Sequence, residues 1–171
     1  NRYFESCGAG ERSGMYYTCI NSYLTADEMA YIVNNSESQV VITSSAKLSL
    51  VVEAMPTFDN VSLILVVGGA PTGSDERVRD YATAIADQPA TAIDNELLGT
   101  SMLYSSGTTG QPKGIIRPLP EQAPSQNLPI FDFLANLWQY RDGMIYLSPA
   151  PLYHSAPQAA VNLTIRQGGT A

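Results

Sequence analysis

A short stretch near the middle of the chain combines hydroxyl side chains, glycines and one lysine in a single loop. It reads Tyr104-Ser105-Ser106-Gly107-Thr108-Thr109-Gly110-Gln111-Pro112-Lys113-Gly114. Glycine tolerates positive φ and lets backbone amides approach a ligand closely, and successive amides form a concave site for anionic oxygens. Hydroxyl groups donate further hydrogen bonds to such oxygens. These residue types predict a loop that binds a polyphosphate, with Lys113 as a mobile positive charge at its far end.

The spacing of this loop differs from that of the common Walker A loop. That motif requires Gly-x-x-x-x-Gly-Lys followed by Ser or Thr, whereas here Pro112 precedes the lysine and Gly114 follows it. A plain surface turn rich in Ser, Thr and Gly is the alternative interpretation. A second glycine-rich segment, 68–73, has no lysine and is interpreted as a turn.

The whole stretch resembles, almost residue for residue, the phosphate-binding signature of the adenylate-forming superfamily, which includes acyl-CoA synthetases, luciferases and nonribosomal adenylation domains. The segment Pro151-Leu152-Tyr153-His154 is similar to a motif that acyl-CoA synthetases carry downstream of that loop. The Phe-Asp-x-Ser pattern usual in amino-acid adenylation domains is absent, which favours a fatty or aryl acid. Segments 21–28 and 31–36 also resemble bacterial acyl-CoA ligases. The resemblance covers essentially the whole chain.

The resemblance implies a ligase that uses ATP, Mg²⁺ and coenzyme A. In this family a carboxylate attacks the α-phosphorus of ATP to give an acyl-adenylate and pyrophosphate, and the thiol of coenzyme A then displaces AMP. The residues implied in nucleotide binding are Ser105, Ser106, Gly107, Thr108, Thr109, Gly110 and Lys113. Thr108 or Thr109 would lie near Mg²⁺, and Lys113 would neutralise the departing pyrophosphate. Tyr153 and His154 would border the carboxylic acid and the channel for coenzyme A, with His154 and Lys113 as the catalytic residues.

Several motifs of the family are missing from the printed sequence. It has no Tyr-Gly-x-Thr-Glu segment for adenine and metal, no Thr-Gly-Asp for the ribose, and no small C-terminal domain with a catalytic lysine. We therefore expect residues 1–171 to be a fragment of the large N-terminal domain that needs the remainder of its polypeptide and is inactive alone. Three functions stay open: a fatty-acyl-CoA ligase, an aryl-acid or luciferase-like ligase, and a non-catalytic nucleotide-binding module.

Composition excludes several other classes of protein. With 44% hydrophobic and 15% charged residues, the chain is typical of a globular protein. Its net charge is −7 and its nine Lys and Arg residues form no run, which argues against nucleic-acid binding. The longest apolar run, 61–67, is too short to span a bilayer. Cys7 and Cys19 lack the number or spacing of a disulfide framework or zinc site, so reduced thiols in the cytoplasm are expected.

Predicted helices and strands alternate, which indicates an α/β fold with a mostly parallel sheet flanked by helices. Helices are expected over 3–12, 26–35, 46–54 and 76–86, and strands over 15–20, 39–43, 62–67 and 101–104. Thr25 and Glu28 form a capping box before the second helix. Strand 39–43 is expected to be buried, and strand 62–67 is too apolar for a sheet edge. The phosphate loop follows strand 101–104, at the strand end where open α/β sheets bind ligands.

The last third of the chain begins with a proline-rich segment, 117–129, that predicts extended backbone. An apolar stripe at helical spacing follows, made up of Phe131, Leu134, Ala135 and Trp138. Packing of this stripe in the core is favoured over lining of an acyl pocket. A strand is expected over 144–148, and Ser155 with Gln158 predicts a second capping box, which places His154 just outside a helix. A lone histidine is more often structural, but the resemblance favours a functional one.

Overall fold

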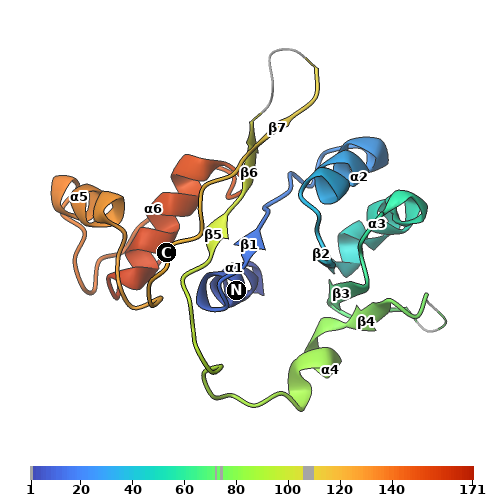
Figure 1. Cartoon of the computed structure of the whole chain (residues 1–171), viewed down its shortest axis with the longest axis horizontal. Coiled ribbons are helices and arrows are strands. Elements are labelled where there is room, and N and C mark those ends of the chain that lie inside the picture. The colour runs from blue at the N-terminus through green and yellow to red at the C-terminus, as the bar shows by residue number, and fades with distance from the viewer. Residues whose placement is uncertain (1, 72, 74, 106–109) are drawn as a thin grey trace.

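The structure is a computed structural model that describes residues 2–71, 73, 75–105 and 110–171. Its helices are α1 (Arg2–Arg12), α2 (Ala26–Asn35), α3 (Leu48–Ala54), α4 (Tyr81–Ala86), α5 (Pro129–Leu137) and α6 (Ser155–Arg166). Two 3-10 turns, η1 (Ser45–Lys47) and η2 (Met55–Thr57), flank α3. The strands are β1 (Tyr16–Tyr17), β2 (Val40–Ser44), β3 (Leu63–Val67), β4 (Val78–Asp80), β5 (Thr100–Ser101), β6 (Leu103–Ser105) and β7 (Lys113–Ile115). Figure 1 shows their arrangement.

The strands pair mostly in parallel, as predicted for the α/β class. In the described ranges they form separate small sheets: β2-β3-β4 and β1-β5 are parallel, and β6-β7 is antiparallel. In place of the strand expected over 144–148, a single parallel bridge joins Ile145 to Thr170. The chain therefore has the predicted class of fold, with its parallel pairs divided between two sheets.

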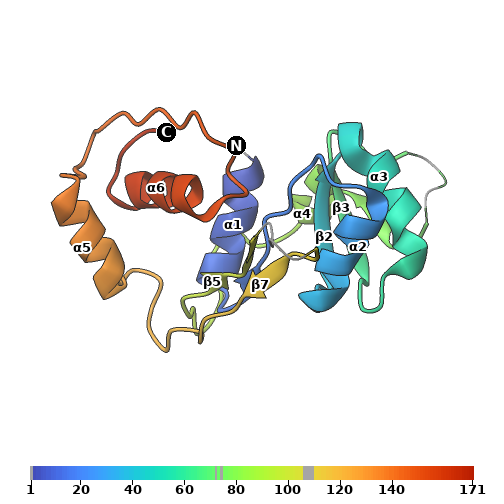
Figure 2. The same cartoon turned by 90° about the horizontal axis from the view of Figure 1, so that it is seen from above.

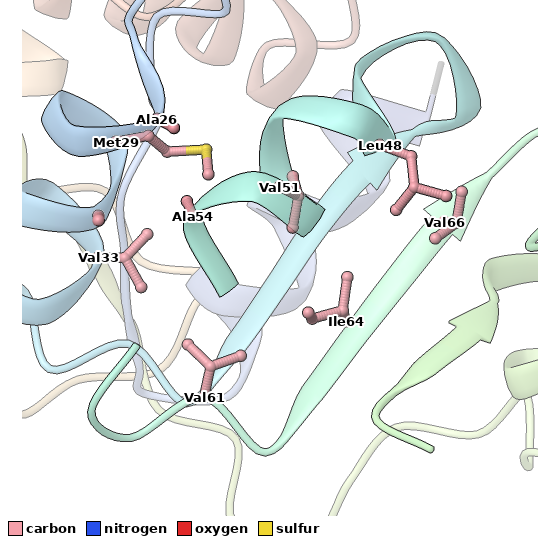
Figure 3. Close-up of a cluster of buried hydrophobic side chains, with 10 residues drawn as sticks. Ala26, Met29, Val33, Leu48, Val51, Ala54, Val61, Ile64 and Val66 are labelled. Atoms are coloured by element: carbon pink, nitrogen blue, oxygen red, sulfur yellow. The ribbon is translucent and has the colours of Figure 1, made fainter. Parts of the chain in front are cut away.

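The main core lies where α2 and α3 cover one face of the β2-β3-β4 sheet (Figure 3). Alternate side chains of β3 point toward the helices, and Ile64 and Val66 are fully buried among them. The helices contribute Met29, Val33, Leu48, Val51 and Ala54. The central place of β3 confirms the prediction from its apolar sequence. The prediction of a buried β2 was wrong, because β2 lies at the edge and leaves Val40 and Ile42 exposed.

The helix α2 begins where its capping box predicts. The Thr25 hydroxyl accepts from the Glu28 amide at 3.3 Å, and the Glu28 carboxylate accepts from the Thr25 amide at 2.8 Å. The bond from the Thr25 amide, followed by one that the Thr25 hydroxyl donates to the same carboxylate at 3.0 Å, lowers the pKa of Glu28. The two side chains therefore satisfy backbone N–H groups at the helix start that have no partner within the helix, as the capping box predicted.

The helix predicted over 76–86 was wrong in its first half. Residues Val78–Asp80 form β4 and pair in parallel with β3, and α4 begins only at Tyr81. The Asp80 carboxylate caps α4 by accepting from the Thr83 amide at 2.7 Å. A β-branched residue such as Val78 suits a sheet, and pairing with a distant strand overrides the local helical pattern.

A second group of contacts joins α1, β1 and α6, and Figure 2 shows α6 beside α1. The Tyr17 hydroxyl donates to the Glu11 carboxylate at 2.7 Å, and the Asn162 amide donates to the same oxygen at 2.8 Å. Burial, with the nearby Glu11 charge, raises the pKa of Tyr17 well above its usual value. Tyr17 therefore stays protonated and keeps this link between the three elements.

Helix α5 does not enter the core that the sequence predicted for it. Phe131, Leu134 and Ala135 are only half-buried, and Trp138 just beyond the helix is 57% exposed. The spacing of apolar residues predicts which face of a helix is apolar, but it does not predict which part of the protein packs against that face. Among the described residues, every helix falls short of the length and apolar character that a bilayer crossing requires.

We expect Ile64→Ala to lower the free energy of unfolding by about 2–5 kcal/mol, because it opens a cavity at the centre of this core. Ile64→Val is the matched control and should cost about 0.5–1.5 kcal/mol. Urea unfolding of the complete protein, followed by circular dichroism, measures both. Equal stability of the two variants would contradict the placement of Ile64 in the core.

Candidate functional site

The predicted phosphate loop joins the two strands of the β6-β7 hairpin (Figure 1). Ser105 ends β6 and Lys113 begins β7, and the two residues are paired in register. The Ser105 hydroxyl donates to the Lys113 carbonyl at 3.5 Å. The predicted binding residues Ser106, Gly107, Thr108 and Thr109 lie outside the described residues. The loop thus follows the carboxyl end of a strand, and its other end enters an antiparallel partner.

The described ends of the loop are accessible to a ligand. Ser105, Gly110 and Lys113 are exposed. Gly110 has φ of 118°, a conformation that favours glycine. Over the described ranges, the Lys113 ammonium has no hydrogen-bond or ion-pair partner. Its positive charge is therefore available to an anionic ligand.

The hairpin is closely packed at Gly114, opposite Tyr104 in the ladder. A Cβ at Gly114 would lie 2.5 Å from the Met102 Cε and 2.9 Å from the Tyr104 Cζ, so a side chain there would displace the tyrosine ring. The Tyr104 hydroxyl donates to the Asn35 Oδ1 at 2.6 Å. Because Asn35 ends α2, this bond ties the hairpin to a helix of the main core.

Burial raises the pKa of Tyr104, and the neighbouring Tyr31 adds to the shift. Tyr104 is therefore a protonated donor at neutral pH. The sequence alone did not assign this role to Tyr104 or Asn35. Both residues lie in segments that resemble the ligase pattern, but their spacing along the chain gives no sign of the contact.

The predicted substrate residue His154 is the N-cap of α6, and its side chain makes no capping hydrogen bond. The capping box predicted for Ser155 and Gln158 was wrong. Ser155 is the first residue of the helix and not its N-cap. Gln158 lies on the inner face of the helix, where it is only 2% exposed. The imidazole of His154 is exposed.

Tyr153 is half-buried, and its ring centroid lies 4.4 Å from that of His154. The Tyr3 hydroxyl donates to the Leu152 carbonyl at 2.7 Å, which anchors this segment to α1. In the part of the chain that the structure describes, no hydrogen bond joins Tyr153 or His154 to the β6-β7 hairpin. The two predicted halves of the site are therefore held by different elements.

The described side chains do not form a protein cage for a metal ion. Within the ranges given above, no group of three or more His, Cys, Asp or Glu residues could hold one. Mg²⁺ usually keeps several waters and binds one or two carboxylates together with substrate phosphates. Thr108, the predicted metal-side residue, lies outside the described residues.

Comparison with known proteins decides the family. The sequence profile described as AMP-binding enzyme matches residues 2–171. The chain belongs to the AMP-binding enzyme family. This member of the AMP-binding enzyme family is 34% identical over 106 positions to the 4-hydroxybenzoate–CoA/benzoate–CoA ligase of Rhodopseudomonas palustris. The match covers 61% of the chain and 19% of that enzyme. The chain is 30% identical over 158 positions to the long-chain-fatty-acid–CoA ligase FadD13 of Mycobacterium tuberculosis. That match covers 88% of the chain and 28% of the enzyme.

Solved structures show the same fold for the AMP-binding chain. A protein of R. palustris CGA009 assigned as a long-chain-fatty-acid CoA ligase matches 99% of the chain and 41% of its own, with a TM-score of 0.77 and 20% identity. The N-terminal domain of FACL13 from M. tuberculosis matches 92% of the chain and 37% of its own, with a TM-score of 0.57 and 24% identity. The fold is thus that of part of an acyl-CoA ligase N-terminal domain.

The hydrogen bond between Tyr104 and Asn35 should limit opening of the hairpin. We expect Tyr104→Phe and Asn35→Ala to speed amide hydrogen exchange in β7, and a double-mutant cycle to give a coupling of about 0.5–1.5 kcal/mol. Tyr23→Phe is the control, because Tyr23 is 85% exposed. Additive effects of the two substitutions would show that the bond does not hold the hairpin.

Proposed function

We propose that the complete protein activates a carboxylic acid with ATP to an acyl-adenylate and then forms an acyl-CoA thioester. One observation supports this most strongly. In a chain of the AMP-binding family, the paired strands β6 and β7 flank a hydroxyl- and glycine-rich sequence, and the exposed Lys113 that begins β7 has no partner for its ammonium among the described residues. The CoA-ligase names of the relatives support the second half of the proposal.

In the first half-reaction, a carboxylate oxygen of the substrate forms a bond to the α-phosphorus, and the bond from that phosphorus to the pyrophosphate oxygen breaks. The loop 105–110 holds the β- and γ-phosphates through backbone amides and hydroxyls. Lys113 turns toward the leaving pyrophosphate and stabilises its growing charge. Thr108 or Thr109 would lie near a bound Mg²⁺, which would supply neutralisation of phosphate charge. None of these side chains is a nucleophile, so their contribution is positioning and electrostatic stabilisation.

Tyr153 and His154 are proposed to border the carboxylic acid and the path of coenzyme A. Two features of the structure support the assignment. The His154 imidazole is exposed and free of a capping bond, so both ring nitrogens can meet a ligand. The Tyr153 ring lies against it and limits its orientation.

A fatty acid is the proposed substrate. The relative named as a long-chain-fatty-acid–CoA ligase matches 88% of the chain, a longer match than that of the benzoate ligase, and this favours an alkyl acid. An aryl acid is the second candidate, because the benzoate ligase has the higher identity, 34%. A non-catalytic nucleotide-binding module remains the third.

Residues 1–171 are proposed to be a fragment of the large N-terminal domain of a cytoplasmic enzyme. The chain spans 19% and 28% of the length of the two curated relatives. Apolar side chains on several elements are exposed and would be covered by the remainder of the polypeptide, among them Val40, Ile42, Ile145 and Leu147. Large exposed apolar surface usually marks an interface. Groups that bind adenine and ribose would also come from that remainder.

We expect Lys113→Ala in the complete protein to lower kcat/KM for ATP–pyrophosphate exchange about 10²–10³-fold, the loss usual when one electrostatic stabiliser is removed. Lys113→Arg should recover part of the activity because it keeps the charge. Lys47→Ala is the matched control, since Lys47 is the other lysine of the chain and contacts the Ser22 carbonyl and the Tyr23 ring. Unchanged exchange in Lys113→Ala would refute the proposed role.

Substrate class is tested by thioester formation with a panel of fatty and aromatic acids. We expect the complete protein to favour fatty acids, and residues 1–171 alone to give no exchange because the adenine and ribose groups are missing. Preference for aromatic acids would select the second candidate. ATP binding by the complete protein without any adenylate would select the non-catalytic module, and exchange by residues 1–171 would overturn the fragment proposal.

A further inference from the structure

Two thiols meet where α1, the segment after β1 and α6 pack together. Cys7 of α1 and Cys19 are the chain's two cysteines, and their Sγ atoms lie 3.9 Å apart. Cys7 is 5% exposed and Cys19 is half-buried. A solvent-borne reagent can therefore reach Cys19 more readily, while Cys7 lies behind it and within contact.

The side-chain amide of Gln158 is directed at this pair. Its Nε2 donates to the Cys19 Sγ at 3.0 Å and lies 3.9 Å from the Cys7 Sγ. Gln158 is 2% exposed, so these sulfurs are the partners available to a buried donor. A neutral thiol is a weak acceptor, whereas a thiolate accepts a strong, charge-assisted bond. The arrangement favours a negative charge on Cys19.

The two thiols are electrostatically unequal. The contact with the Cys7 thiol lowers the pKa of Cys19, and the Gln158 amide adds to the shift, although burial and the Glu11 charge oppose it. The same contact, together with burial, raises the pKa of Cys7. Cys19 is thus the nucleophilic thiol, and Cys7 holds the proton until Cys19 is oxidised.

We propose that Cys7 and Cys19 are a redox pair that forms a reversible disulfide when the protein meets a hydroperoxide. The Cys19 thiolate attacks the terminal peroxide oxygen, the O–O bond breaks, and a sulfenic acid forms with release of hydroxide or an alkoxide, which takes a proton from water. The Cys7 sulfur then attacks the Cys19 sulfur, its proton leaves with the departing hydroxyl as water, and the S–S bond forms. Two electrons pass from the thiols to the peroxide, and a dithiol reductant returns them.

This disulfide would join α1 to the segment that leads into α2. Forming it requires the sulfur atoms to close from contact to about 2.05 Å. It also removes the acceptor of the buried Gln158 amide in the second turn of α6, close to the N-cap His154. Oxidation should therefore loosen the start of α6. The proposal is independent of the proposed ligase function, because its test measures the masses of peptides and not enzyme activity.

Peptide mapping of the complete protein tests the disulfide directly. Arg12 lies between the cysteines, so trypsin places Cys7 in peptide 3–12 and Cys19 in peptide 13–47. After native treatment with hydrogen peroxide and blocking of free thiols, we expect one cross-linked species, lighter than the two peptides by two hydrogen atoms and separated by a dithiol. Recovery of the two peptides apart, whether unmodified or oxidised singly at Cys19, would overturn the proposal.

Two variants test the roles of the neighbours. In Cys7→Ser we expect the cross-link to vanish and a 1,3-dione reagent to trap a sulfenic acid on Cys19. In Gln158→Leu we expect alkylation of Cys19 at neutral pH to slow roughly tenfold, the loss of one charge-assisted bond. Absence of the Cys19 sulfenic acid in Cys7→Ser, in protein whose circular dichroism matches wild type, would contradict the order of the two steps. An unchanged rate in Gln158→Leu would contradict support of the thiolate by Gln158.

Discussion

The close approach of the Tyr104 ring to Gly114 is the contact on which the candidate site depends. Position 114 has no room for a Cβ, because the end of the Met102 side chain and the tyrosine ring both lie against it. The ring can then send its hydroxyl to Asn35 at the end of α2. Since α2 packs on β3 in the main core, the ends of the proposed phosphate loop are fixed relative to the most buried part of the chain. Under the proposed function the loop holds an anion, and rigid supports at its ends suit that role because its contribution is mainly positioning.

Features with local causes could be read from the sequence. The capping box at Thr25 fixes the start of α2 through side chains that are neighbours along the chain. The apolar character of 63–67 alone identifies a central strand. The residue types of the loop 105–114 also predict phosphate binding on local grounds, since glycine and hydroxyl groups have the same conformational and hydrogen-bonding properties in any fold, and this role stays a prediction.

Features that depend on distant contacts could not be read in this way. Val78 joins a sheet because β3 is available to pair with it, and the helical pattern around it gives no sign of that partner. The N-cap of α6 is His154 and not Ser155, and Gln158 points inward, toward thiols more than a hundred residues earlier in the sequence. The contacts of Tyr104 with Asn35 also span distant segments. These are the links that join the predicted site residues to the fold.

Hydrogen exchange of the complete protein with and without MgATP tests the central claim that the loop 105–114 holds the polyphosphate. We expect nucleotide to slow exchange of backbone amides in this loop, because those amides would donate to phosphate oxygens. Peptides from α4, which lies outside the hairpin, should be unchanged. Saturating nucleotide that protects other segments and leaves 105–114 unaltered would contradict the account.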